Sequence, residues 1–135
     1  MNTTTPVLSE SAQIIVDNTK EFLKDYEVFG NLLLIGIHKP PEKTKSGIIL
    51  SNQTLDEAKW QSTVGLVLKV GPGAFEDRPD WKFYRQSVSV GKWVHFKTSS
   101  GFLMMLGKQE CRLLRDSYVL GTVTDPEILT KHDYV

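Results

Sequence analysis

The sequence predicts a mainly β protein, a small antiparallel β-barrel preceded by one amphipathic helix. Three observations lead to this prediction. From Gly30 onward the apolar residues fall in short runs of strand length, and glycine-containing turns separate these runs. Within the first 29 residues, the apolar positions recur instead mostly at steps of three and four. Several short strands joined by such turns are typical of a small barrel.

Residues 1–29 are predicted to form an N-terminal extension with a helix over about Ser9 to Lys24. Ser9 or Ser11 can cap its first turn. The β-branched run Ile14-Ile15-Val16 would also suit a strand. An apolar helix face must cover something, either its own barrel or a neighbouring subunit, and the sequence leaves both open. The apolar residues with helical spacing are Leu8, Ala12, Ile15, Val16, Phe22 and Leu23.

Residues 30–123 are predicted to form the barrel, and residues 124–135 a mostly polar C-terminal tail. Turn chemistry such as Gly71-Pro72-Gly73 ends the individual strands. Two long connections, 39–62 and 74–87, interrupt the regular pattern. The expected strands are Leu32 to Ile37, Thr63 to Val70, a strand beginning at Trp93, Phe102 to Leu106, Gln109 to Arg115 and Ser117 to Val123.

The connection 39–62 carries three consecutive aliphatic residues, Ile48, Ile49 and Leu50, in a polar setting. Two prolines, Pro40 and Pro41, prevent the preceding strand from continuing. In an extended chain Ile48 and Leu50 point to one side and Ile49 to the other, so they cannot all cover the same surface. The trio is therefore either an ordinary buried strand after a glycine turn or a segment that needs a groove on another molecule.

The connection 74–87 combines four aromatic residues with charges that cancel: Phe75, Trp81, Phe83 and Tyr84 are the aromatics. A connection of this length in a small domain usually has a function. We expect a hairpin that packs its aromatics against itself or against a neighbouring copy. A base-stacking surface is the alternative, but it would need a wider basic patch.

Composition excludes several classes of function. The 135 residues have a formal net charge of zero, which argues against a nucleic-acid or anionic-membrane partner held by bulk charge. A single cysteine, Cys111, and the lack of a signal-peptide pattern or an apolar span favour a reduced cytoplasmic protein. His38, His95 and His132 lack partners at metal-ligand spacing, and there is no phosphate-loop motif. We therefore expect no enzyme, no metal site and no cofactor.

Five motifs follow one another from about Asn31 to Val123, and their order and spacing resemble those of the GroES co-chaperonin family. No single motif is specific, but five in this order are hard to obtain by chance. After the first strand they are Lys43-Thr44-Lys45-Ser46-Gly47-Ile48-Ile49-Leu50, Gly65-Leu66-Val67-Leu68-Lys69-Val70-Gly71-Pro72-Gly73-Ala74, Val88-Ser89-Val90-Gly91-Lys92-Trp93-Val94-His95-Phe96 and Cys111-Arg112-Leu113-Leu114-Arg115-Asp116-Ser117-Tyr118-Val119-Leu120-Gly121-Thr122-Val123.

The resemblance implies a GroES-like β-barrel that assembles into a homo-oligomeric ring, usually a heptamer. Such a ring is the lid of an ATP-driven chaperonin and encloses a non-native client protein. A hydrophobic tripeptide after a glycine, in a mobile loop, would dock on the chaperonin's apical domains. Here that motif matches Gly47, Ile48, Ile49 and Leu50 in the loop 39–62. ATP and Mg²⁺ would be bound by the chaperonin and not by this chain.

The resemblance also implies the remaining site residues. The first and last strands leave unpaired edges that would pair between neighbouring subunits. The roof hairpin would be the connection 74–87, with Phe102 near the cavity wall. The expected interface residues are Leu32, Leu34, Ile35, Tyr118, Leu120 and Val123, and the expected roof and cavity residues are Phe75, Trp81, Phe83, Tyr84 and Phe102.

Departures from the family keep a second hypothesis open. The family lacks a helical N-terminal extension of this kind, and it usually ends close to the position of Val123. A divergent, bacteriophage-encoded co-chaperonin with a capsid protein as client, acting in the host cytoplasm, would fit these differences. The alternative is a virion structural or decoration protein that keeps the barrel and uses its extension and tail to bind a virus particle.

Overall fold

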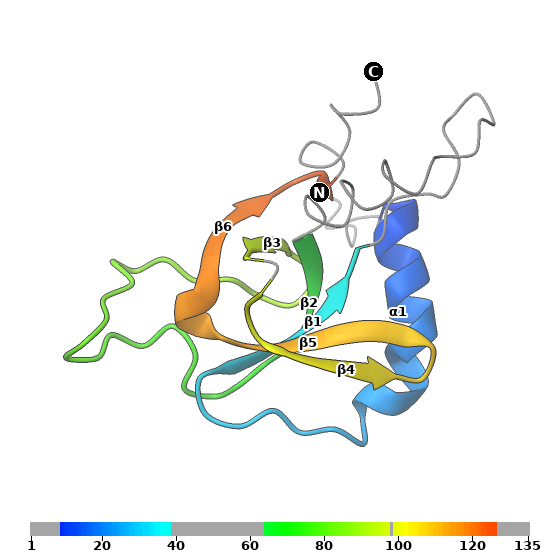
Figure 1. The fold of residues 1–135 in the computed structure, drawn as a ribbon, viewed down its shortest axis with the longest axis horizontal. Coiled ribbons are helices and arrows are strands. Elements are labelled where there is room, and N and C mark those ends of the chain that lie inside the picture. Colours follow the sequence, from blue (N-terminus) through cyan, green and yellow to red (C-terminus); the bar gives the residue numbers. More distant parts are fainter. Residues whose placement is uncertain (1–8, 39–63, 98, 127–135) are drawn as a thin grey trace, which may run out of the picture.

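The computed structural model describes residues 9–38, 64–97, 99–126 of the chain, and it confirms a mainly β fold with one N-terminal helix (Figure 1). Six antiparallel strands form one sheet in the order β4-β5-β1-β2-β3-β6. The elements are α1 (Glu10–Leu23), β1 (Leu32–Ile37), β2 (Val64–Val70), β3 (Trp93–Phe96), β4 (Phe102–Leu106), β5 (Gln109–Arg115), a 3₁₀ turn (Asp116–Tyr118) and β6 (Val119–Val123).

Helix α1 forms where the sequence predicts it and covers its own sheet. The hydroxyl of Ser9 caps the helix by accepting a hydrogen bond of 3.2 Å from the amide of Ala12. The helix buries Ala12, Ile15 and Thr19, and the Thr19 hydroxyl donates to the Ile15 carbonyl at 2.8 Å. This answers the question that the sequence left open, because the apolar face packs against its own sheet, over β2, β4 and β5 and close to Gly36 of β1.

Gly36 in the middle of β1 lets the helix approach the sheet. A Cβ atom at this position would lie 2.5 Å from Cγ2 of Ile15 and 3.2 Å from Cδ1 of Leu68. The helix therefore packs almost directly on the strand backbone. A side chain at position 36 would push α1 away from the sheet.

The sheet buries apolar residues on both of its sides, which explains why the sequence of β1 is apolar almost throughout rather than alternating. On the helix side, Leu34 packs with α1; on the other side, Leu33 and Ile35 pack inside the curled sheet. The helix-side cluster is Ala12, Ile15, Val28, Leu34, Val64, Leu66, Leu68, Trp93, Leu106 and Cys111. The inner cluster is Leu33, Ile35, Ile37, Val67, Val94, Phe96 and Leu114.

The sheet order corrects one sequence-based expectation. Strand β1 is not an edge, because it pairs with β2 on one side and with β5 on the other. Leu34 and Ile35 are fully buried within their own chain, and Leu32 is half-buried. The assignment of Leu34 and Ile35 to a subunit interface is therefore wrong. The edges of the sheet are β4 and β6.

Because α1 completes the core, Ile15→Ala should lower the free energy of unfolding by about 3 kcal/mol, the loss expected for a buried aliphatic side chain. The neighbouring Ile14 is 54% exposed, so Ile14→Ala is a matched control that should change stability by less than about 0.5 kcal/mol. Urea denaturation measures both. Equal effects of the two substitutions would contradict the packing of α1 described here.

Candidate functional site

The residues that flank the connection 39–63 lie side by side at one end of the β1–β2 pair. Ile37 is opposite Gly65, and the amide of His38 donates to the carbonyl of Val64 at 3.0 Å. The buried His38 ring meets Trp93 edge-on, with ring centroids 5.6 Å apart. The connection therefore leaves from a firmly packed base. The predicted chaperonin-binding residues Gly47, Ile48, Ile49 and Leu50 lie outside the described residues.

The connection 74–87 closes on itself as a hairpin at its tip. Arg78 and Trp81 exchange two backbone hydrogen bonds, of 2.8 Å and 3.1 Å. Phe83 lies at the centre of the loop: its ring is 5.4 Å from that of Phe75, and the guanidinium of Arg78 lies 5.5 Å above it. The sequence left open whether the aromatics of this loop pack against one another or against a neighbouring copy. In this chain Phe75 and Phe83 pack against each other.

This packing corrects part of the predicted roof. Phe83 is only 8% exposed, so its ring is not a surface group, whereas Phe75 is half-buried against the inner cluster. Trp81, Tyr84 and Phe102 are exposed, as a surface role requires. The correction has a simple cause, since a loop without a regular hydrogen-bond ladder needs a small apolar centre of its own to hold a conformation.

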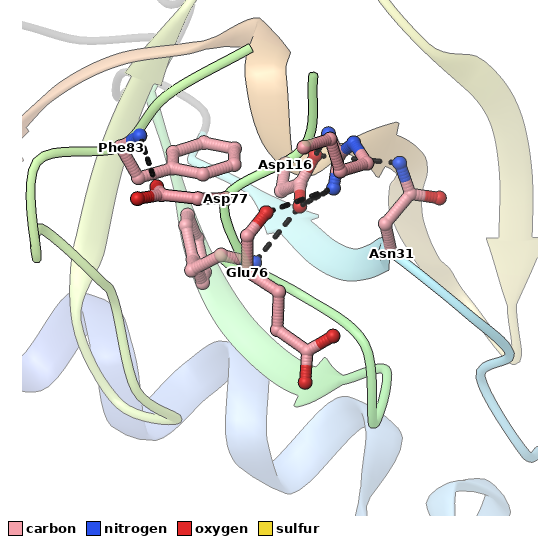
Figure 2. A network of polar contacts seen from close by, with 7 residues as sticks. Asn31, Glu76, Asp77, Phe83 and Asp116 are labelled. Atoms are coloured by element: carbon pink, nitrogen blue, oxygen red, sulfur yellow. Dashed lines mark hydrogen bonds and ion pairs between the residues drawn. The ribbon is translucent and has the colours of Figure 1, made fainter. Parts of the chain in front are cut away.

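Asp116 holds the loop 74–87 to the barrel (Figure 2). Its carboxylate is fully buried and accepts hydrogen bonds from the amide of Phe75 at 2.8 Å and from Arg78, at 2.8 Å and 3.1 Å. Asn31 reaches the same carboxylate from the start of β1, at 3.4 Å. The amide of Asp116 in turn donates to the carbonyl of Asn31 at 2.9 Å. One side chain thus joins three segments that are far apart in the sequence.

The charge of Asp116 is stabilised where it lies. Burial by itself would raise the pKa of the carboxyl group, but the hydrogen bonds from Arg78 and from the Phe75 amide, together with the positive charge of Arg78, outweigh burial and lower the pKa. The same ion pair raises the pKa of Arg78. Asp116 is therefore ionised at neutral pH, and the bidentate pair is a fixed structural element.

The network also holds a strained backbone. Phe75 has a φ of 65°, in the left-handed region that non-glycine residues rarely adopt. Its amide points at the Asp116 carboxylate as a result. Tyr84 and Arg85, with φ of 54° and 66°, turn the chain back after Phe83. The bonds to Asp116 offset the cost of the conformation at Phe75.

The two sheet edges display apolar side chains to solvent. On β6 and the preceding turn, Leu120 and Tyr118 are exposed and Val123 is half-buried, as an interface strand requires. On β4, Phe102, Leu103 and Met105 are exposed although the strand is otherwise a regular partner of β5. The sequence pattern did not single out β4, because an apolar run of five residues usually indicates a buried strand.

Two observations concern the reactivity of Cys111 and metal binding by the described residues. Burial raises the pKa of the Cys111 thiol to about 11, so it stays protonated and unreactive at neutral pH. Within residues 9–38, 64–97, 99–126, no three His, Cys, Asp or Glu side chains gather in a way that could hold a metal ion. None of the helices in these ranges has the length and apolar character needed to cross a membrane.

Sequence reasoning missed Asp116 and Arg78, the residues that fix the loop. The one available signal was a lone Asp between two apolar strands, in Arg115-Asp116-Ser117. Nothing in a single sequence connects it with an arginine 38 positions earlier.

Comparison with known proteins gives one consistent result. The family model described as the chaperonin 10 kDa subunit matches residues 26–123. A 10 kDa chaperonin of Brassica napus is 37% identical over 95 residues, which cover 70% of this chain and 89% of the relative. A co-chaperonin GroES of Clostridioides difficile is 34% identical over 95 residues, 70% of this chain and 94% of the relative. A mitochondrial 10 kDa chaperonin of Arabidopsis thaliana is 37% identical over 93 residues, 69% of this chain and 88% of the relative.

Removing the charge of Asp116 should loosen the loop 74–87 and destabilise the fold. We expect Asp116→Asn to lower the free energy of unfolding by about 2 kcal/mol, which is less than the loss for a fully buried pair because Arg78 stays partly exposed. The matched control is Asp17→Asn, which breaks an exposed ion pair with Lys20 and should cost under about 0.5 kcal/mol. Urea denaturation of both variants makes the comparison.

Comparing the natural chain with Asp116→Asn also tests how the contribution of Asp116 to stability depends on pH. Because the folded-state pKa of Asp116 is lowered, its contribution is fully present above the unfolded-state value near 3.8 and is lost as the pH falls through the folded-state pKa. The stability difference between the natural chain and Asp116→Asn should therefore be constant from neutral pH to about pH 5 and shrink below about pH 4. A difference that grows on acidification would contradict an ionised Asp116.

Proposed function

Since the chain belongs to the chaperonin 10 kDa subunit family, we propose that it acts as a co-chaperonin that closes a chaperonin as a ring-shaped lid and assists ATP-dependent folding of an enclosed client. The match of residues 26–123 to the family carries this proposal. The family is one of co-chaperonins and not of enzymes. We expect ATP and Mg²⁺ to be bound by the chaperonin and the protein to act in the cytoplasm.

We assign docking to Gly47, Ile48, Ile49 and Leu50. The packed base of the connection, where His38 and Val64 are hydrogen-bonded, supports this assignment, because it supplies a fixed point from which a binding segment can reach a partner. Burial of each aliphatic side chain contributes roughly 1.5–3 kcal/mol. Ordering each backbone residue costs roughly 1–2 kcal/mol, so a single segment binds weakly. Several segments on one ring bind together through their effective concentration.

A ring requires two different surfaces on each subunit, and we propose the edge of β6 as one of them. The choice is supported by the exposed side chains of Leu120 and Tyr118 and by the outer side of this strand, which pairs with none of the described strands. With β1 inside the sheet, the complementary surface has to lie elsewhere. We propose residues 25–29, which precede β1 outside the sheet and carry Phe29, 69% exposed. In Figure 1 this stretch and β6 lie at the lower and upper sides of the view.

Docking is tested by mixing the protein with a chaperonin and nucleotide and measuring co-sedimentation and ATP hydrolysis. We expect nucleotide-dependent binding and slowed hydrolysis. Ile49→Ser should abolish both, since the ring loses one aliphatic anchor per subunit and avidity multiplies the loss. Ile14→Ser, at an exposed position on α1, is the control and should bind normally. If neither the natural chain nor Ile49→Ser binds the chaperonin or changes its ATP hydrolysis, the result favours the alternative of a structural protein of a virus particle.

The assembly is tested separately by analytical ultracentrifugation. Leu120→Asp places a charge at the proposed subunit contact and should shift the protein to smaller species, whereas Val90→Asp, at an equally exposed apolar position, should not. Ile35→Asp is unsuitable as a test because it buries a charge in the core. A ring that survives Leu120→Asp would remove β6 from the interface.

A further inference from the structure

Strand β4 combines a free edge with exposed apolar side chains. It pairs only with β5 among the described strands, so the N–H and C=O groups of its other side have no sheet partner there. Phe102 is 73% exposed, Leu103 55% and Met105 59%. Edge strands of soluble proteins are usually protected by charges or prolines, and β4 has neither along Phe102–Leu106. A free edge of this kind can accept another strand.

The segment of chain that contains β4 is basic. Residues 97–115 carry four basic side chains and one acidic side chain, a net charge of +3 in a chain whose formal charge is zero. Three of the four, Lys97, Lys108 and Arg115, are exposed. Arg112 lies opposite Leu103 in the β4–β5 pair and donates to the Ser100 carbonyl at 2.7 Å. The strand is therefore an apolar edge with a positively charged rim.

These features decide between two possible occupants of the edge. A second copy joining β4 to β4 would bring together two 97–115 segments, each of charge +3, which like-charge repulsion disfavours. An extended segment with apolar and acidic residues fits both the edge and its rim. Non-native polypeptides expose such segments, and methionine adapts its shape to varied partners.

We propose that the free edge of β4 binds extended, apolar and acidic segments of a non-native client by adding them as a further strand. This inference rests on the proposed co-chaperonin function, and it adds a direct contact between the lid and the client. The backbone of β4 provides hydrogen bonds of low sequence preference. Phe102, Leu103 and Met105 provide apolar contacts, and the basic rim selects acidic segments.

The test uses the full chain without a chaperonin. A fluorescein-labelled peptide in which valine and leucine alternate with glutamate and threonine is titrated with the protein, and binding is followed by fluorescence anisotropy. A second peptide with lysine in place of glutamate is the control. We expect the glutamate peptide to bind about tenfold more tightly than the lysine peptide, with the difference decreasing as salt is added.

Two variants test whether peptide binding depends on β4 or on any exposed apolar side chain. Leu103→Thr combined with Met105→Thr keeps strand-forming residues and should weaken binding of the glutamate peptide by about tenfold. Ile14→Thr on α1 should leave binding unchanged. Equal binding of the two peptides, no effect of the double substitution, or a change in oligomeric state caused by it would each overturn the proposal.

Chaperonin co-sedimentation of the same samples distinguishes this inference from the proposed function. If the double variant still binds the chaperonin but the natural chain fails to bind the glutamate peptide, only the role of β4 is rejected. If the peptide binds and the chaperonin does not, the proposed function is rejected and the peptide-binding edge remains.

Discussion

The buried carboxylate of Asp116 is the constraint on which the loop 74–87 and the start of β6 depend. It lies where β5 turns into β6, and its partners come from the start of β1 and from the loop 74–87. The loop has three left-handed non-glycine residues, whose conformational cost adds to that of ordering the loop. The carboxylate supplies the missing hydrogen-bond acceptors, so the conformation of the loop and the course of β6 are fixed together.

Helix α1 imposes the second constraint, and it lies in a part of the chain that the family does not cover. The family match begins at residue 26, so α1 lies outside the matched region. Nevertheless the helix closes one side of the sheet over Leu34, Leu66 and Leu68, and Gly36 allows the close approach. The helix is thus part of the hydrophobic core, and the apolar residues of β1 and β2 on that side depend on its presence.

The strands and the helix were predictable from the sequence because each depends on local patterns of spacing, caps and turns. The strand order was not, since pairing β1 with β5 involves residues about 80 positions apart and leaves no periodic trace. For this reason the sequence alone places Leu34 and Ile35 at an edge of the sheet, whereas β1 lies between β2 and β5. The irregular register between β1 and β2 also leaves no trace in the sequence. It lies opposite Leu34 and Ile35, next to Leu68, whereas Gly65 serves close packing against β1. Phe83 illustrates the same limit, because its burial depends on Arg78 and Phe75 folding over it.

The two edges of the sheet differ in a way that allows different partners. Leu120 on β6 lies in a strand without charged residues, which suits a contact between identical subunits, where a single-sign patch would repel its copy. The rim of β4 carries a net positive charge that would hinder such a contact but favours an acidic partner. In the proposed assembly the weakly binding docking segments act together through the ring, and β6 is the proposed subunit contact. The edge of β4 would then stay open in every subunit.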